Sequence, residues 1–228
     1  MLPNIKYTIY KTRRRSLMLK LKNDGTVAIY CPKSYPKKKA LEFLSANTEK
    51  LLRLANERKV KQTSAIFGGD SAIPTLLYFG ARYPVLYGQV KKLTFNGETF
   101  TAPKDSSLED IRLMYKSFLR AEAKRVIPPL VSALAQKYGL SYNKIFIKDI
   151  SSRFGSCSAK KNLNFSLALS AFCEEFISFI VLHELAHTVH LNHSDKFYLL
   201  LSRICPEHKR ISKEYSKVYS NVLKAICS

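Results

Sequence analysis

The stretch VLHELAHTVHLNHSDKFY, residues 181–198, constrains this chain more than any other part of it. It continues an apolar run, residues 176–182, and a helix that is apolar nearly all round is typically buried. His183 and His187 are four residues apart, so on a helix they lie on one face, one turn apart, and both imidazoles can reach one ion. Glu184 is turned about 100° from His183, which places it beside such an ion. The spacing predicts a metal site on a buried helix.

A catalytic zinc site needs a third protein ligand and one open position. In a straight helix His190 would lie about 10 Å further along the axis than His183, too far to share the ion. His193 can reach the ion if the chain turns back after His190. The sequence at 192–195, Asn-His-Ser-Asp, permits that turn, because asparagine tolerates a left-handed helix end and Ser-Asp can start a new helix. We predict His193 as the third ligand and His190 as a neighbouring group.

Other side chains further along the chain compete for these roles. Two glutamates on a later helix, Glu207 and Glu214, could supply a carboxylate ligand in the manner of thermolysin, and they rank behind His193. We expect His208 to lie on the surface of that later helix.

The carboxylate beside the ion indicates hydrolysis. Glu184 stands where a general base accepts a proton from the attacking water, and zinc lowers the pKa of such a water to about 7. We expect a zinc-dependent hydrolase, foremost a peptidase, with Arg153 or Tyr198 stabilising the oxyanion. The histidines match the metzincin skeleton HExxHxxGxxH. However, His190 replaces the glycine and none of the three methionines follows His193, so a metzincin Met-turn is excluded.

The fold class is predicted as α+β, beginning with a β-rich region. Residues 1–105 show the alternating apolar pattern of strands, with hairpin turns at Asn23–Gly25 and Asn96–Gly97. One helix, at 36–59, interrupts these strands.

Residues 106–228 are predicted as an α+β catalytic domain. Ser106 and Glu109 have capping-box spacing at the start of a long helix that Gly139 can end. Pro128 and the proline after it should kink or split this helix. The segments NKIFIKDI and NLNFSLALS are strand-like, and the histidine helix follows them.

Composition bounds the partners and the cellular location. The net charge of +21, from 38 Lys and Arg against 17 Asp and Glu, attracts polyanions, and a basic surface without a specific partner is an equally good interpretation. The five cysteines are scattered without a CxxC pair, which predicts reduced thiols in a cytoplasmic protein. Cys157 is expected to be a small buried thiol rather than a nucleophile. No signal peptide or membrane span is expected, and the oligomeric state is left open.

Two segments, RFGSCSAKKNLNFSLAL and VLHELAHTVHLNHSDKFY, resemble the YgjP-like metal-dependent hydrolase family. The family pattern is Arg-Trp-Gly-Ser-Cys-Ser, an Asn-Leu-Asn strand, then HELxH and a later Asn-His-Ser; Phe154 stands at the usual tryptophan. The resemblance extends over nearly the whole chain, through the DG hairpin and YFGARYPV. It implies a minimal zincin-like fold, related to SprT-type proteases, with an edge strand that holds a peptide beside the cleft. By motif match it implies zinc ligands His183, His187 and His193 and catalytic Glu184. We predict Arg153, Ser156 and Asn164 as substrate-binding side chains that offer hydrogen bonds beside the cleft, and turn and strand packing is an equally good interpretation of these three.

Two other functions remain open beside the zinc peptidase. One keeps the metal chemistry but changes its target, as a nucleotide or phosphoanhydride hydrolase or a DNA-associated protease, although no phosphate-cradling glycine motif supports it. The other is a nucleic-acid-binding module whose zinc is structural, with His190 or Cys205 closing the coordination.

Overall fold

The computed structural model describes residues 6–22, 25–68 and 73–227, and the chain is α+β as predicted. It divides into two compact units, residues 1–61 and residues 62–227. The predicted division at 105/106 differs from this one. The difference arises because the strands between residues 75 and 103 share one hydrophobic core with the histidine helix, instead of joining the first strands of the chain.

Unit 1 is a small sheet covered on one face by helix. Strands β1 (Tyr7–Thr12), β2 (Met18–Leu21) and β3 (Val27–Pro32) form a sheet of order β1-β3-β2, in which β1 and β3 are parallel and β2 is antiparallel to β3. Residues 23 and 24 of the predicted turn lie outside the described residues. The single helix predicted at 36–59 is present as two helices, α1 (Lys37–Ala46) and α2 (Thr48–Phe67), which are separated at Asn47.

Unit 2 begins with a four-stranded sheet. Its order is β4-β5-β7-β6, with β4 (Thr75–Tyr78) antiparallel to β5 (Ala81–Gly88), and β6 (Thr94–Phe95) antiparallel to β7 (Phe100–Pro103). The predicted Asn96–Gly97 turn joins β6 to β7, and Gly97 has a positive φ of 103°. The β4–β5 turn reaches the segment before the histidine helix, because the Phe79 and Gly80 amides donate to the Ser170 and Ala171 carbonyls.

The long helix α3 (Leu108–Tyr138) corrects two predictions. Its capping box uses Ser107 and Asp110, one residue later than expected: the Asp110 amide donates to the Ser107 hydroxyl at 3.2 Å and the Ser107 amide to the Asp110 carboxylate at 3.0 Å. The helix also runs through Pro128 and Pro129 without splitting. A buried side chain at every fourth position, from Ile111 to Ala135, anchors both halves in one core and offsets the lost backbone bonds. Gly139 ends the helix in the left-handed conformation, as predicted.

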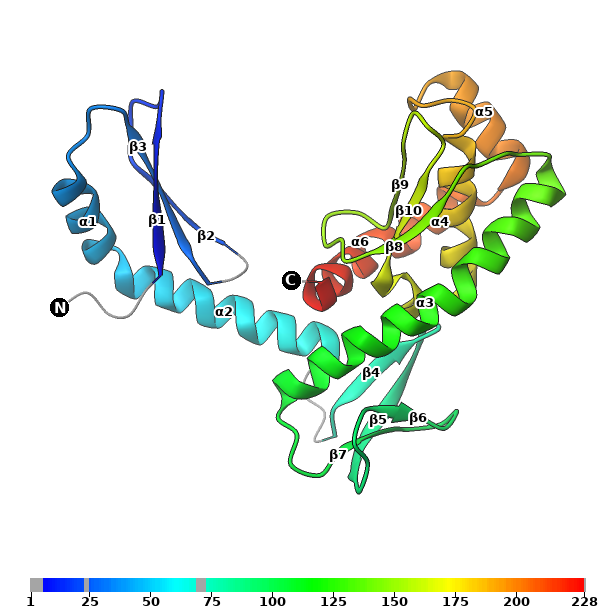
Figure 1. Cartoon of the computed structure of the whole chain (residues 1–228), viewed down its shortest axis with the longest axis horizontal. Helices are drawn as coiled ribbons and strands as arrows, with labels where there is room; N and C mark the ends of the chain where they lie inside the picture. Colours follow the sequence, from blue (N-terminus) through cyan, green and yellow to red (C-terminus); the bar gives the residue numbers. More distant parts are fainter. Residues whose placement is uncertain (1–5, 23–24, 69–72, 228) are drawn as a thin grey trace. The chain divides into compact units, whose positions relative to one another are not determined.

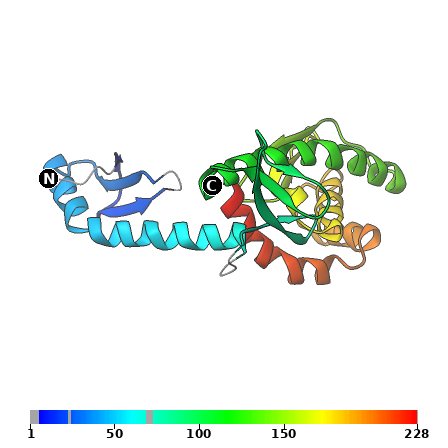
Figure 2. The same ribbon diagram turned by 90° about the horizontal axis from the view of Figure 1, so that it is seen from below.

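The remaining elements of unit 2 carry the histidines. A second sheet has the order β8-β10-β9, from β8 (Ile145–Lys148), β10 (Leu163–Ser166) and β9 (Gly155–Cys157), so β9 is an edge strand. The predicted strand NLNFSLALS stops at Ser166 and continues as a 3₁₀ helix, Leu167–Ala171. Helix α4 (Glu174–Ala186) lies against β9, α3, α5 (Asp195–Ile204) and α6 (His208–Cys227) (Figure 1, Figure 2). The side chains of α4 are therefore fixed from several directions.

Two chain-wide expectations can be compared with this structure. Within residues 6–22, 25–68 and 73–227, none of the helices combines the length and the apolar character that a membrane crossing requires. All five cysteines are free thiols in this structure.

Candidate metal centre

Helix α4 carries the HExxH motif as predicted, but it ends earlier than a straight helix through His190 would. Its last residue is Ala186, and His187 is the C-cap. The Leu185 carbonyl accepts from both the Thr188 amide at 3.0 Å and the Thr188 hydroxyl at 2.7 Å, which closes the last turn of the helix. Among the described non-glycine residues, positive φ occurs at Phe79 and Lys161, so Asn192 does not supply the predicted left-handed turn. Ser194 is the N-cap of α5, as predicted.

The turn between α4 and α5 brings three imidazoles together. The Nε2 atom of His193 lies 3.1 Å from Nε2 of His183 and 3.2 Å from Nε2 of His187. A tetrahedral zinc ion with Zn–N bonds of about 2.0–2.1 Å would separate its nitrogen ligands by roughly 3.4 Å. The two separations from His193 are thus within a few tenths of an ångström of the spacing that one ion requires, and all three ligand nitrogens lie within 4.8 Å of one another.

His187 is held in the tautomer that a metal ligand needs. Its Nδ1–H donates to the backbone carbonyl of His190 at 3.0 Å, which leaves the Nε2 lone pair facing the other two rings. His190 therefore contributes through its main chain. Burial lowers the pKa of His183 to about 4, and burial also lowers the pKa of His187. Both rings are neutral at physiological pH, the form that binds metal.

Phe197 on α5 supports all three rings, a role that the sequence did not reveal. Its buried ring stacks on His187 at 4.4 Å between centroids and meets His183 and His193 edge-on at 5.1 and 4.9 Å. Phe197 lies in the first turn of α5, four residues after His193, and a large aromatic residue so soon after the last histidine is the signal that could have identified it.

Glu184 lies beside the cluster with one carboxylate oxygen unused. The residue is 5% exposed, and within the described part of the chain its Oε2 atom has no hydrogen-bond partner. Burial raises the pKa of Glu184 to about 8, and nearby Arg153 acts in the opposite direction. Buried polar atoms in native proteins nearly always have partners, so an open acceptor at this position needs an explanation. A water molecule or a substrate proton at the centre would provide one.

Gly155 gives Glu184 its space. A Cβ atom built on Gly155 would lie 2.8 Å from both Cγ and Oε1 of Glu184, closer than real atoms pack. The φ angle of Gly155 is not positive, so the glycine is required by the carboxylate and not by the backbone. This residue belongs to the quoted RFGSCS segment, but its role could not be inferred before the strand was placed against α4.

Gly155→Ala should therefore impair catalysis without unfolding the chain. We expect the displaced Glu184 side chain to lower kcat by roughly 100-fold, since misplacement by about 1 Å can cost that much. Steady-state kinetics on a cleaved peptide measures the change. Cys157→Ser, two residues along the same strand, is the control. Burial raises the pKa of this half-buried thiol to about 11, so it stays protonated and should be dispensable. Equal losses in both variants would contradict the packing explanation.

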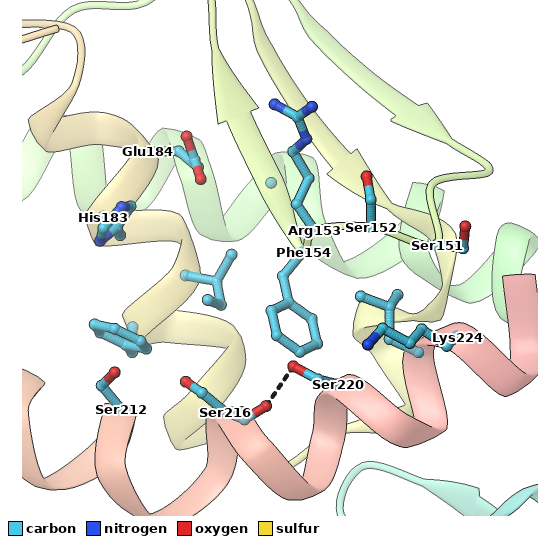
Figure 3. Close-up of a pocket in the computed structure, with 14 residues that line it drawn as sticks. Ser151, Ser152, Arg153, Phe154, His183, Glu184, Ser212, Ser216, Ser220 and Lys224 are labelled. Atoms are coloured by element: carbon cyan, nitrogen blue, oxygen red, sulfur yellow. Dashed lines mark hydrogen bonds between the residues drawn. The ribbon is translucent and has the colours of Figure 1, made fainter. Parts of the chain in front are cut away.

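A pocket of about 350 Å³ opens beside Glu184 and His183. Figure 3 shows α4 on one side, the segment leading into β9 above, and α6 below. The Phe154 ring points down towards the serines of α6, whereas Arg153 extends the other way, to the level of Glu184. The apolar part of the pocket wall comes from Phe154, Phe179, Ile180 and Leu223. Hydroxyl groups one helical turn apart on α6 form another part of the wall: Ser212, Ser216 and Ser220.

The three predicted substrate-binding residues are placed differently from one another. Arg153 is exposed and lines the pocket. Ser156 on β9 and Asn164 on β10 face each other in the antiparallel register, and the Asn164 amide donates to the Ser156 hydroxyl at 3.3 Å. That contact joins two strands, so at least part of their hydrogen-bonding capacity is used within the sheet.

The competing ligands lie elsewhere. Arg210 binds Glu207 at 2.8 Å and Glu214 at 3.0 Å, and the metal-capable group among the described residues consists of the three histidines alone. Cys205 therefore does not close the site. His208 is buried, contrary to prediction: its Nδ1–H donates to the Cys205 carbonyl at the start of α6, and its ring stacks near Tyr198 at 6.5 Å between centroids. The donor set, three imidazoles without a fourth protein ligand in the group, is that of a catalytic zinc site.

A family model described as YgjP-like, metallopeptidase domain, matches residues 15–217. No curated protein sequence matches the chain. Among solved structures, the crystal structure of the metallopeptidase zymogen of Pyrococcus abyssi abylysin matches with 21% sequence identity and a TM-score of 0.37, covering 40% of this chain and 93% of that chain.

Proposed function

Because the chain belongs to the YgjP-like metallopeptidase domain family, we propose that it is a zinc-dependent peptidase in which His183, His187 and His193 hold the ion. One observation carries this proposal: three Nε2 atoms converge at 3.1 and 3.2 Å beside a buried carboxylate with an unpartnered oxygen. Three imidazoles also suit other transition metals, and zinc is favoured because its catalytic sites commonly pair such ligands with an open position.

Glu184 is the general base and acid of the proposed reaction. When bound, zinc would polarise the scissile carbonyl and acidify the attacking water. Glu184 accepts the proton of that water on its open oxygen and returns it to the leaving amine. Burial raises the pKa of Glu184 to about 8 because the pocket disfavours the charged carboxylate, and a nearby cation would favour the ionised base. Arg153 and Tyr198 are our candidates for stabilising the oxyanion.

A peptide is the substrate that this surface fits best. Strand β9 is an edge of its sheet and contacts α4, so its free edge can pair with an extended backbone next to the centre. The adjoining pocket can receive one substrate side chain between Phe154 and Ile180 on its apolar walls and Ser216 on α6. We expect an apolar residue to be preferred next to the cleaved bond.

Cleavage of a peptide library tests the proposal against its alternatives. The zinc-loaded chain should cut peptides, lose that activity on chelation, and recover it on addition of zinc, while its circular dichroism spectrum persists without metal. Mass spectrometry locates the cleavage sites. Release of phosphate from nucleotides without peptide cleavage would instead favour the nucleotide hydrolase. A spectrum that collapses on chelation, with no hydrolysis of either substrate, would favour the structural-zinc module.

A further inference from the structure

Positive charge is concentrated in unit 1. Residues 1–61 hold 16 Lys and Arg against 4 Asp and Glu, a net +12, whereas residues 62–228 hold 22 against 13, a net +9. About a quarter of the chain thus carries more than half of the charge excess. A field of this strength over so small a unit attracts a polyanion.

The sheet of unit 1 has one packed face and one open face. Leu19, Val27 and Ile29 belong to the face that packs against Ala40 and Leu44 of α1. Side chains alternate along a strand, so the intervening residues point the other way. We call these residues the tyrosine face: Thr8, Tyr10, Met18, Lys20 and Tyr30. They are exposed or half-buried, whereas the small Ala28 between them on β3 is buried, and α1 covers the opposite face.

Two aromatic rings lie at the centre of the tyrosine face. Tyr10 and Tyr30 are cross-strand partners whose rings stack at 5.1 Å with an interplanar angle of 19°. The Lys22 amine donates to the Tyr10 hydroxyl at 2.8 Å and lies 5.1 Å from the centre of that ring. An aromatic platform and a cation therefore occupy one surface.

Three consecutive arginines border this platform. Tyr10 near the end of β1 and Met18 at the start of β2 both pair with Tyr30, near the C-terminal end of β3. The segment 13–17, which joins β1 to β2, therefore passes this end of β3. Within this segment Arg13, Arg14 and Arg15 are exposed. No carboxylate of the described residues forms an ion pair with them or with Lys20. Their charges are available to an external anion.

We propose that the tyrosine face and the adjoining arginines bind single-stranded nucleic acid. Proteins that bind single strands without sequence preference combine aromatic side chains, on which bases stack, with cations along the phosphate backbone. Tyr10 and Tyr30 provide the first feature, and the arginine segment with Lys20 provides the second. A duplex hides the faces of its bases within its own stack, so it would use the charges but not the tyrosines. The tyrosine face shares no residue with the metal centre, and its assignment does not depend on the peptidase proposal.

Anisotropy of a labelled oligothymidylate, titrated with the full chain over a range of salt concentrations, tests this assignment. Changing Arg13, Arg14 and Arg15 together to Glu should weaken binding and reduce the slope of log K against log[salt] by about 2, at roughly 0.7 per lost phosphate contact. Tyr30→Leu should weaken binding roughly tenfold or more with little change in slope, since stacking is not ionic.

A matched variant separates a site from a general charge effect. Lys91, Lys92 and Lys104 are exposed in unit 2, and changing all three to Glu alters the net charge equally. This control should bind nearly as wild type, and all variants should cleave a short peptide normally. The proposal would be overturned by equal losses of binding in both triple variants, or by wild-type binding in Tyr30→Leu. It would also be overturned if the chain preferred duplex nucleic acid or phosphatidylserine vesicles to the single strand. If Tyr30→Leu fails to fold, as thermal melts would show, the salt slope of the arginine variant decides.

Discussion

Glu184→Gln is expected to reduce peptide hydrolysis by roughly 100- to 10,000-fold, the usual contribution of a positioned general base, while the metal content stays unchanged. Glutamine has nearly the shape of glutamate, so the packing against Gly155 is kept and only the capacity to carry a proton is lost. Single-turnover kinetics with a fluorogenic peptide and metal analysis of the same sample measure the two quantities. A variant that loses metal along with activity would show that Glu184 supports the ion instead.

The same substitution has a pH-dependent effect on stability that shows whether the carboxylate is as desolvated as the structure indicates. In the metal-free native state the Glu184 pKa is about 8, against an ordinary value of 4.5. Between these values the unfolded chain has lost a proton that the native chain retains. The stability of wild type relative to Glu184→Gln should therefore fall as pH rises from about 4.5 to about 8, then level off. Denaturant titrations of both metal-free proteins give this difference, and a flat difference would mean a solvated carboxylate.

The centre was largely predictable because its geometry is encoded over short distances. Positions 183, 184 and 187 share one helix, so helical spacing alone places two imidazoles and a carboxylate. The third imidazole required only a turn within six residues. The chain does turn back and brings His193 to the other two rings, as predicted. The predicted cause of the turn was wrong, because Asn192 does not adopt a left-handed conformation. Instead, α4 ends at Ala186 with backbone and Thr188 hydrogen bonds.

The surroundings of the centre were not predictable, because they come from segments far apart in the chain. Gly155 faces Glu184 only once β9 has packed on α4, and the serines of α6 approach Phe154 only in the folded unit. His208 looked like a surface residue because its helix is strongly amphipathic and polar residues flank it. In the folded unit it is buried, with Nδ1–H donating to the Cys205 carbonyl and its ring stacked near Tyr198. Local pattern thus predicts which side chains do chemistry better than it predicts what shapes the space around them.

His193→Ala should abolish both metal binding and peptide hydrolysis. The Nε2 of His193 lies within 3.2 Å of the other two Nε2 atoms, so it completes the triangle of nitrogens, and two imidazoles alone leave a zinc ion mostly exchangeable. We expect less than stoichiometric zinc after dialysis and activity at background. The fold should persist, because His193 is exposed and the core of unit 2 does not include its side chain.

Glu214→Gln, with Glu207→Gln beside it, is the matched control for the third ligand. Both glutamates contact Arg210 on the surface of α6, and neither belongs to the metal-capable group of the described residues. Losing an exposed ion pair costs only about 0–1 kcal/mol, so the double variant should keep its zinc and its rate. Isothermal titration with zinc, followed by peptide kinetics, compares the two proteins. If the glutamate variant loses zinc and His193→Ala retains it, the carboxylate-ligand alternative is correct and the three-histidine centre is not.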